Sequence, residues 1–139
     1  MSLYYKSIVE KIKFEGRAFI NGKYVDAIDG EKFDNINPAT GETLCSVARC
    51  NHKDVDLAVK VSRKAFNSGV WSRTSPEFRK DTLLKFAELL RQTGEENSVL
   101  ECVDTGKLIG DCINEVANDA PMHFQWYGEL IDKVFGKVG

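Results

Sequence analysis

The sequence lacks the features that mark membrane, secreted and nucleic-acid-binding proteins. No apolar run approaches the roughly 20 residues that a membrane helix needs, and the opening MSLYYKSIVEKIKFEG mixes acids with lysines, unlike a targeting peptide. The 19 basic and 21 acidic residues give a formal net charge of −2. This balance favours neither nucleic acid nor a membrane surface as a partner. We expect a cytoplasmic protein whose 139 residues form one domain or one piece of a larger one.

The sequence has few cysteines, and no two of them are closely spaced. There are 4, and no Cys-x-x-Cys motif occurs among them, so neither a disulfide framework nor a redox pair is favoured. A zinc site formed by Cys45, Cys50 and His52 would lack a defined fourth ligand. His52 is better explained as a residue in the first turn of a helix.

Cys102 lies in the segment LECVDTGK, near the expected end of a helix. A reactive cysteine needs a base, a cation or a helix N-terminus beside it. The neighbours of Cys102 are instead the carboxylates Glu101 and Asp104, and both oppose a thiolate. We therefore interpret Cys102 as a packing residue, and Cys112, which lies on an apolar stripe, in the same way.

Two β-hairpins are expected in the first third of the chain. In FINGKYV, apolar residues flank an Asn-Gly pair that tolerates the positive φ angles of a type I′ turn. In FDNINPATGETLCSV, Pro38 and Gly41 indicate a wider connection. This second pattern predicts strands near residues 33–36 and 43–48.

Helical periodicity dominates the remaining sequence. Apolar residues at intervals of four predict a short helix over residues 4–13. A second helix of about four turns begins at Asn51, which can act as its N-cap with Asp54 in the first turn. The positions on its apolar face are Val55, Ala58, Val59, Ser62 and Phe66.

The segment SPEFRKDTLLKFAELLRQTG carries start and stop signals of its own. Ser75 is the expected N-cap, Pro76 the first helical residue and Gly94 the terminator. A shorter helix is predicted from about Glu95 to Val103, with Gly106 and a lysine just past its end.

A last helical stripe runs from Ile109 to Phe135 and contains Pro121, which must break or kink it. The final residues, FGKVG, have the character of an approach to another strand, so we expect a fragment of a larger protein. No G-x-G-x-x-G dinucleotide motif occurs. The residues alone thus predict a mostly helical unit with N-terminal β-hairpins and no recognisable active site.

Taken in order, six segments make the sequence similar to the N-terminal part of NAD(P)-dependent aldehyde dehydrogenases. They are FINGKYV, NINPATGE, DVDLAVKVSRKAF, WSRTSPEFRKDTLLKFAELL, LECVDTGK and FQWYGELIDKVFGKV, and together they span residues 19–138. WSRTSPEFRK, LECVDTGK and QWYGELIDKV most resemble members that oxidise γ-glutamyl-γ-aminobutyraldehyde and related aminoaldehydes.

The resemblance implies an α/β fold with a Rossmann-like cofactor domain, a catalytic domain and an oligomerisation arm. Residues 1–139 would form the N-terminal segment, with a strand-hairpin arm over about 18–48 and a helical part over about 51–135. The catalytic domain would be absent. The full-length enzyme would be a homo-oligomer that uses NAD or NADP.

The resemblance also implies a mechanism. A cysteine thiolate attacks the aldehyde, a hydride passes to the nicotinamide, and a glutamate base helps water to hydrolyse the thioester. The family nucleophile stands in a Gly-Gln-x-Cys setting, which none of the 4 cysteines matches. We therefore expect the isolated chain to be inactive and to bind no NAD or NADP by itself. The alternative is a freestanding helical interaction module derived from such an enzyme.

A monovalent cation site is a further implication of the resemblance. In many relatives the cation is held by a carboxylate at the position of Asp104 and by a backbone carbonyl at the position of Ile36, with another ligand beyond residue 139. The residues themselves fit plainer roles equally well. Asp104 suits hydrogen bonding at a helix end, and Ile36 suits the core side of a strand.

A substrate contact is implied as well. The position seven residues before the aromatic pair Trp126-Tyr127 lines the aldehyde tunnel in relatives, and here it is Asp119. Its carboxylate would attract a distal ammonium group of the substrate. The plainer interpretation is that Asp119 faces water or caps the turn that Pro121 interrupts.

Overall fold

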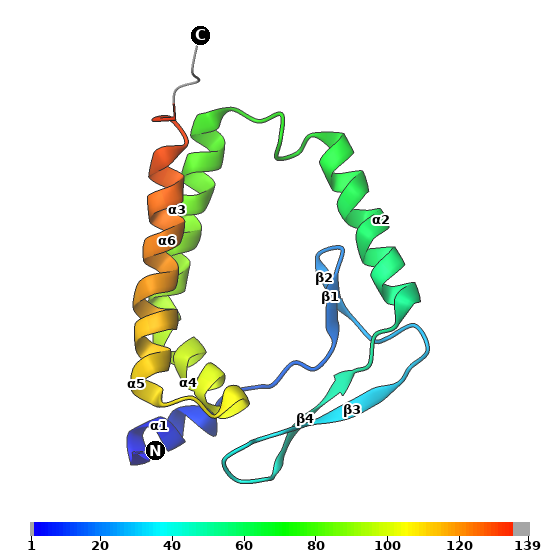
Figure 1. The fold of residues 1–139 in the computed structure, drawn as a ribbon, viewed down its shortest axis with the longest axis vertical. Helices are drawn as coiled ribbons and strands as arrows, with labels where there is room; N and C mark the ends of the chain where they lie inside the picture. Colours follow the sequence, from blue (N-terminus) through cyan, green and yellow to red (C-terminus); the bar gives the residue numbers. More distant parts are fainter. Residues whose placement is uncertain (1, 135–139) are drawn as a thin grey trace. The chain divides into compact units, whose positions relative to one another are not determined.

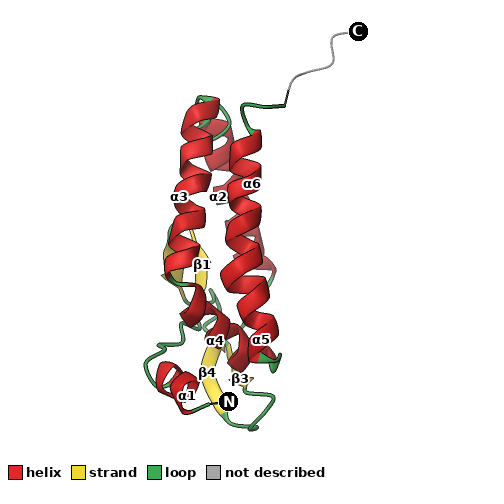
Figure 2. Ribbon diagram, turned by 90° about the vertical axis from the view of Figure 1, so that its left-hand side faces the viewer, coloured by secondary structure: helices red, strands yellow, loops and turns green. Residues whose placement is uncertain are grey.

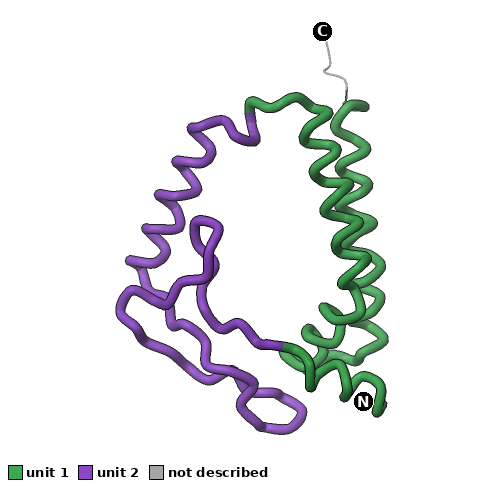
Figure 3. The backbone as a smooth tube through the Cα atoms, turned by 180° about the vertical axis from the view of Figure 1, so that it is seen from behind, with its two compact units in different colours: residues 1–12, 73–139 green, residues 13–72 purple. Residues whose placement is uncertain are grey.

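The computed structural model describes residues 2–134. The chain divides into two compact units: unit 1 comprises Met1–Ile12 and Arg73–Gly139, and unit 2 comprises Lys13–Ser72 (Figure 3). Phe135 and the FGKVG ending, to which the sequence assigns a helix end and a strand approach, lie outside the described residues.

The first hairpin of unit 2 consists of β1 (Ala18–Ile20) and β2 (Lys23–Val25), which pair antiparallel. Its two turn residues, Asn21 and Gly22, have φ angles of 56° and 75°. Both values are positive, as a type I′ turn requires. The hairpin predicted from the Asn-Gly pair is confirmed.

The second hairpin joins β3 (Lys32–Ile36) to β4 (Thr43–Ala48), again antiparallel. Asn37 closes the connection from both sides. Its N–H donates to the Glu42 carbonyl at 2.9 Å, and its carbonyl accepts from the Gly41 N–H at 2.8 Å. Both strands predicted for this segment are confirmed.

Helix α2 (His52–Ser68) starts at a reciprocal capping box. The Asn51 side chain accepts from the Lys53 N–H at 2.8 Å, and one oxygen of Asp54 accepts from the Asn51 N–H at 2.9 Å. The other Asp54 oxygen accepts from the Ile28 N–H at 2.9 Å, which ties the helix to the loop after β2. These hydrogen bonds from Asn51 and Ile28 lower the pKa of the Asp54 carboxyl group. The predicted helix start is confirmed.

Unit 1 is built from helices. Two of them, α3 (Pro76–Gln92) and α6 (Ala120–Leu130), lie side by side along their length (Figures 1 and 2). The short α1 (Leu3–Val9) packs against α4 (Gly94–Thr105). Ser75 caps α3, as predicted, by accepting from the Phe78 N–H. The buried residues of this unit include Ala87, Val99, Val103, Cys112 and Pro121.

Helix α1 is shorter than the predicted helix over residues 4–13, because it ends at Val9. Beyond that residue the N–H groups of Lys11 and Ile12 bond carbonyls only three residues back. The helix therefore gives way to tighter turns. The apolar spacing that includes Ile12 does not continue as a helix.

Gly94 corrects a second prediction. The sequence predicts it as the terminator of α3, but Thr93 is the C-cap and Gly94 is the first residue of α4. A Cβ added at Gly94 would lie 2.8 Å from the Cβ of Ala117. Glycine is needed here because the backbone packs closely, and no left-handed turn is involved. The predicted left-handed glycine is Gly106, with φ 76°, at the end of α4.

Pro121 interrupts the last helical stripe, as predicted. The short α5 (Ile109–Cys112) continues as η1 (Ile113–Asp119), a π-helical segment, before α6 begins. The Ala120 N–H donates to the Glu115 carbonyl five residues back. A proline ring clashes with the carbonyl four residues back in a regular α-helix, so a wider turn before Pro121 relieves that clash.

An ion pair links α3 to the residues after α6. The Nζ of Lys80 lies 2.8 Å from Oδ2 of Asp132, and the bonds from Lys80 and Lys133 lower the pKa of the Asp132 carboxyl group to about 2. A carboxyl group with a lowered folded-state pKa stabilises the fold above its unfolded pKa of about 4 and loses that contribution as the pH falls towards about 2. We expect the thermal midpoint to fall more steeply over this range in the wild type than in Asp132→Asn.

Asp56→Asn is the matched control for this titration. Asp56 is an exposed carboxylate of α2 without a hydrogen bond or ion pair to the rest of the described chain. Its removal should leave the slope of the thermal midpoint against pH unchanged. Equal slopes for the wild type and Asp132→Asn would show that the ion pair contributes nothing.

Candidate functional site

Asp119 is the last residue of η1 and directly precedes α6. The residue is exposed, and its carbonyl accepts a hydrogen bond from Nδ1 of His123 at 2.7 Å. Met122 and Trp126 follow three and seven positions later, so the three side chains share one helix face. Met122 is 54% exposed and Trp126 61% exposed. These three side chains combine one acid with a thioether and an indole ring, and the exposed His123 lies beside Asp119 on the same face.

Such a face suits an organic cation. A carboxylate pairs with an ammonium group through charge-assisted hydrogen bonds, and an indole ring attracts a cation that lies over its face. The structure therefore places the sequence-predicted Asp119 where a ligand can reach it. Its role as a tunnel residue stays a prediction.

The two residues of the predicted cation site belong to different units. Asp104 is an exposed residue in the last turn of α4, in unit 1. Ile36 ends β3, in unit 2, and its side chain is 45% exposed. The interpretation of Ile36 as a core residue is wrong for the described chain, because nearly half of the residue is exposed. The cation site stays a prediction.

Neither cysteine of unit 1 resembles an activated nucleophile. Cys102 is half-buried in the last turn of α4, and its thiol donates to the Lys107 carbonyl at 3.1 Å. Cys112 is completely buried, and burial raises the pKa of its thiol, with smaller contributions from Cys102 and Glu101. A raised pKa keeps the thiol protonated and unreactive. The packing interpretation is confirmed for Cys112, whereas Cys102 is held by a hydrogen bond at the helix end.

The remaining cysteines lie in unit 2: Cys45 is half-buried in β4, and Cys50 is exposed. Across residues 2–134, no group of three or more His, Cys, Asp and Glu side chains is placed to hold a metal ion. Over the same residues, no helix has both the length and the apolar composition needed to span a bilayer.

Lys107 has a structural role that the sequence does not predict. Its Nζ lies 2.7 Å from Glu115 and 3.4 Å from Glu101, and hydrogen bonds from Lys107 to these two carboxylates raise its own pKa. The sequence shows a Gly-Lys pair after a helix but not the acid eight residues later that completes the bridge. Lys107 fixes the loop between α4 and α5 against η1.

The described residues do not fit a dinucleotide phosphate site. Dinucleotide phosphates bind at the N-terminus of a helix that follows a strand closely. In the described chain this arrangement occurs where β4 leads into α2. There the Asn51 side chain and the Asp54 carboxylate already occupy backbone N–H groups. A carboxylate at this position repels a phosphate.

The aldehyde dehydrogenase family model matches residues 24–139. The chain belongs to the aldehyde dehydrogenase family. The aldehyde dehydrogenase PuuC of Escherichia coli, described as NADP/NAD-dependent, is 38% identical over 135 residues, which are 97% of this chain and 27% of the relative. The resemblance inferred from the sequence is confirmed.

Solved aldehyde dehydrogenases share the fold of this chain. The γ-glutamyl-γ-aminobutyraldehyde dehydrogenase of Burkholderia cenocepacia is 40% identical, with a TM-score of 0.93, over 98% of this chain and 28% of that one. The indole-3-acetaldehyde dehydrogenase AldA of P. syringae, in complex with NAD+ and IAA, is 42% identical, with a TM-score of 0.92, over 97% of this chain and 27% of that one. The chain thus corresponds to the N-terminal part of an aldehyde dehydrogenase and spans about a quarter of the length of these relatives.

Proposed function

We infer that this chain serves as the N-terminal part of an enzyme that oxidises an aldehyde to a carboxylate with NAD or NADP. The observation that carries the proposal is the match to the aldehyde dehydrogenase family over residues 24–139. The name of PuuC, with both cofactors, and the NAD+ complex of AldA support the cofactor class.

The contribution of this chain to catalysis is positional. The family chemistry needs a thiolate nucleophile and a base, and the thiol of Cys112 is instead protonated by burial. Contacts of α6 with α3 and η1, and of η1 with α4, hold in place the exposed face formed by Asp119, Met122 and Trp126. The 139-residue chain alone is expected to show no aldehyde oxidation and to bind neither NAD nor NADP.

A cationic aldehyde is the substrate that the Asp119 face suits. The carboxylate would hold a distal ammonium group, while Met122 and Trp126 would line the path of the carbon chain. The relative from Burkholderia cenocepacia, named for an aminobutyraldehyde derivative, supports this choice. Association into a homo-oligomer and the alternative of a freestanding interaction module stay predictions.

A chimera tests the family activity. This chain replaces the matching segment of PuuC, joined in frame to the rest of that enzyme. We expect aldehyde-dependent reduction of NAD or NADP, because the replaced segment is 38% identical over 135 residues. A folded chimera without turnover would contradict the proposal, and the 139-residue chain assayed alone is the blank.

Asp119→Asn in the chimera tests the substrate class. Loss of a charge-assisted contact costs about 1.5 kcal/mol, so KM for an aminoaldehyde should rise about tenfold while KM for a neutral aldehyde of equal length changes little. Asp111→Asn, at an exposed acid of α5, is the matched control and should leave both values unchanged. An equal rise for both aldehydes in Asp119→Asn would remove the ammonium contact.

A further inference from the structure

The turn of the first hairpin in unit 2 brings two reactive groups together. The side-chain amide of Asn21 is followed by the backbone N–H of Gly22, and both residues are exposed. Their φ angles of 56° and 75° place both in the left-handed region. Within residues 2–134, neither the Asn21 side-chain amide nor the Gly22 N–H has a hydrogen-bond partner. Hydrogen bonds therefore protect neither group from reaction with the other.

The surroundings of this turn give it little protection either. A Cβ built at Gly22 would have no heavy atom within 4 Å, and glycine itself has no side chain to block its nitrogen. Strands β1 and β2 have 3 residues each, and a two-stranded hairpin is marginally stable in water. Local opening therefore releases the turn from its native conformation often enough for slow chemistry to occur there.

We propose that Asn21 is a site of spontaneous covalent modification, where the side-chain amide is converted to aspartate and isoaspartate, and that the isoaspartate form opens the β1–β2 hairpin. The nitrogen of Gly22 forms a bond to Cγ of Asn21 and closes a cyclic imide. The bond from Cγ to the side-chain nitrogen breaks, and this nitrogen leaves as ammonia with the proton of the Gly22 N–H.

Water then opens the imide at one of two bonds. Cleavage between the Gly22 nitrogen and Cγ of residue 21 yields aspartate. Cleavage between the same nitrogen and the backbone carbonyl carbon of residue 21 yields isoaspartate, in which the main chain passes through Cγ. In both cases a water molecule is consumed and an ammonia molecule is released, and nothing is oxidised or reduced.

Asp29-Gly30 has a related sequence but is protected. Aspartate closes the same imide only with a protonated carboxyl group, since a carboxylate is a poor electrophile. Asp29 accepts from Nζ of Lys53 at 2.9 Å and from the Asn51 side chain at 2.6 Å, and these bonds lower the pKa of its carboxyl group. The Gly30 N–H is also occupied, because it donates to the Ala27 carbonyl at 2.8 Å. We expect this turn to remain unmodified.

Helices protect two other asparagines that precede a small residue. Asn67 in α2 and Asn97 in α4 are each followed by serine. In a helix the following N–H is bonded to the carbonyl four residues before it. The Asn97 side chain also donates to Oγ1 of Thr93 at 2.9 Å. Imide formation at either position therefore requires the helix to open first.

Isoaspartate changes the length of the main chain in the turn. The hairpin pairs Ile20 with Lys23 across the two turn residues, and loop length selects both the turn type and the register. An extra main-chain carbon in this loop is incompatible with that pairing. The rings of Phe19 and Tyr24, 5.1 Å apart across the strands, would separate with it.

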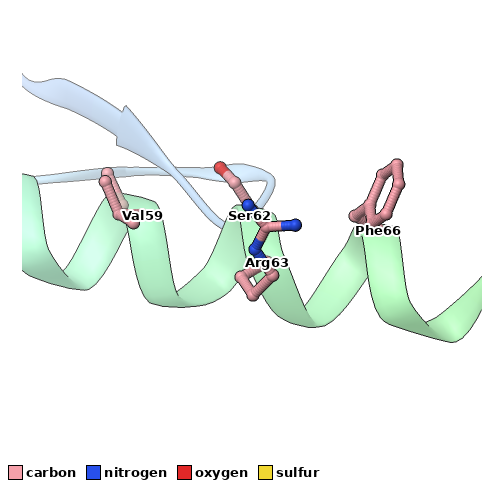
Figure 4. Close-up of a pocket in the computed structure, with 5 residues that line it drawn as sticks. Val59, Ser62, Arg63 and Phe66 are labelled. Carbon is pink, nitrogen blue, oxygen red and sulfur yellow. The ribbon is translucent and has the colours of Figure 1, made fainter.

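Helix α2 does not depend on the hairpin. β1 contacts α2, but the start of the helix is held separately by the bond between Asp54 and the Ile28 N–H. Further along the helix, Val59, Ser62 and Phe66 project together and help to line a groove that is open to solvent (Figure 4). The helix thus does not need β1 to cover these side chains, and we expect it to stay folded when the hairpin opens.

Ageing of the 139-residue chain in neutral buffer tests the reaction. Peptide mass spectrometry follows the exchange of ammonia for water, and methyl transfer by an isoaspartyl methyltransferase detects isoaspartate. Asn21 should react at least about tenfold faster than Asn67 and Asn97, because helical hydrogen bonds protect the latter. Asn21→Gln should lose the signal at this position, since glutamine closes a larger ring more slowly. Similar rates at the three asparagines would overturn the proposal.

Ageing in urea separates the effect of the fold from that of the sequence. Unfolding should accelerate the reaction at Asn21 by less than about tenfold and at Asn97 by about a hundredfold or more, because only the latter is protected in the folded chain. Isoaspartate at position 29 should appear in urea and not in the folded chain. Protection of Asn21 as strong as that of Asn97, or isoaspartate at position 29 in the folded chain, would contradict the proposal.

NMR of the isoaspartate form, separated from the aged chain by ion exchange, tests the opening of the hairpin. The nuclear Overhauser effects between the Phe19 and Tyr24 rings should be lost, whereas those between successive amides of α2 should remain. Asn21→Asp is the matched control, because it adds the same charge with an ordinary main chain and aspartate tolerates the left-handed region. Ring contacts that persist in the isoaspartate form, or that are lost equally in Asn21→Asp, would overturn the opening mechanism.

Discussion

Gly16→Ala is expected to destabilise unit 2 by about 3 kcal/mol, at the upper end of overpacking effects. A Cβ at this position would lie 2.0 Å from the carbonyl oxygen of Ser46 and 2.9 Å from its carbonyl carbon. Both atoms belong to the backbone of β4, so no change of rotamer removes the clash. The Gly16 carbonyl also accepts from the Ala48 N–H at 2.7 Å, and a shift of either segment would break this bond. Urea unfolding followed by circular dichroism measures the loss.

Gly110→Ala is the control for Gly16→Ala. No heavy atom lies within 4 Å of a Cβ built at Gly110, which is part of α5. Alanine is favoured over glycine in a helix by about 1 kcal/mol, so this variant should match or exceed the wild type in stability. If Gly16→Ala unfolded at the same urea concentration as Gly110→Ala, the close approach of Gly16 to β4 would be wrong.

Features fixed by neighbouring residues are the ones that the sequence predicts well. The positive φ angles of Asn21 and Gly22 follow from the chemistry of an Asn-Gly pair. The caps at Asn51 and Ser75 follow from side-chain acceptors placed two or three residues before the N–H groups they bind. No distant part of the chain is needed to specify any of them.

Features that depend on residues far apart in the chain are not predicted by sequence patterns. Asp54 also accepts a hydrogen bond from the N–H of Ile28, 26 residues earlier, and the capping pattern does not predict this bond. The sequence predicts Gly94 as a helix terminator because it gives no sign of the contact with Ala117. That contact forms only when α4 packs on η1. Local rules assign a glycine a turn by default, whereas packing can require glycine for lack of space.

The candidate site also has features that the sequence predicts and features that only the structure shows. Periodicity predicts which residues of α2 share an apolar face, but a stripe has the same pattern whether it is buried in its own chain or left for a partner. Only the structure shows that Val59 and Phe66 are exposed. Asp119 is singled out by the resemblance to a family, and only the structure shows that it is exposed, as Trp126 is seven residues later.

Gly94→Ala is expected to destabilise unit 1 by about 2 kcal/mol, within the usual range for overpacking. The added Cβ would lie 2.8 Å from the Cβ and 3.0 Å from the Cα of Ala117. Contacts this short force α4 and η1 apart, and the buried residues Ser98 and Val99 on the same helix lose packing with them. The free energy of unfolding from urea titrations measures the effect.

A double-mutant cycle with Ala117→Gly identifies the cause. Ala117→Gly alone costs about 1 kcal/mol, because glycine is less favourable than alanine within a helix. In the double variant the methyl group at position 94 takes the space left at position 117, so the combined loss should be smaller than the sum of the single losses by about 1 kcal/mol or more. Strict additivity would contradict a close contact between the two methyl groups as the reason for glycine at position 94.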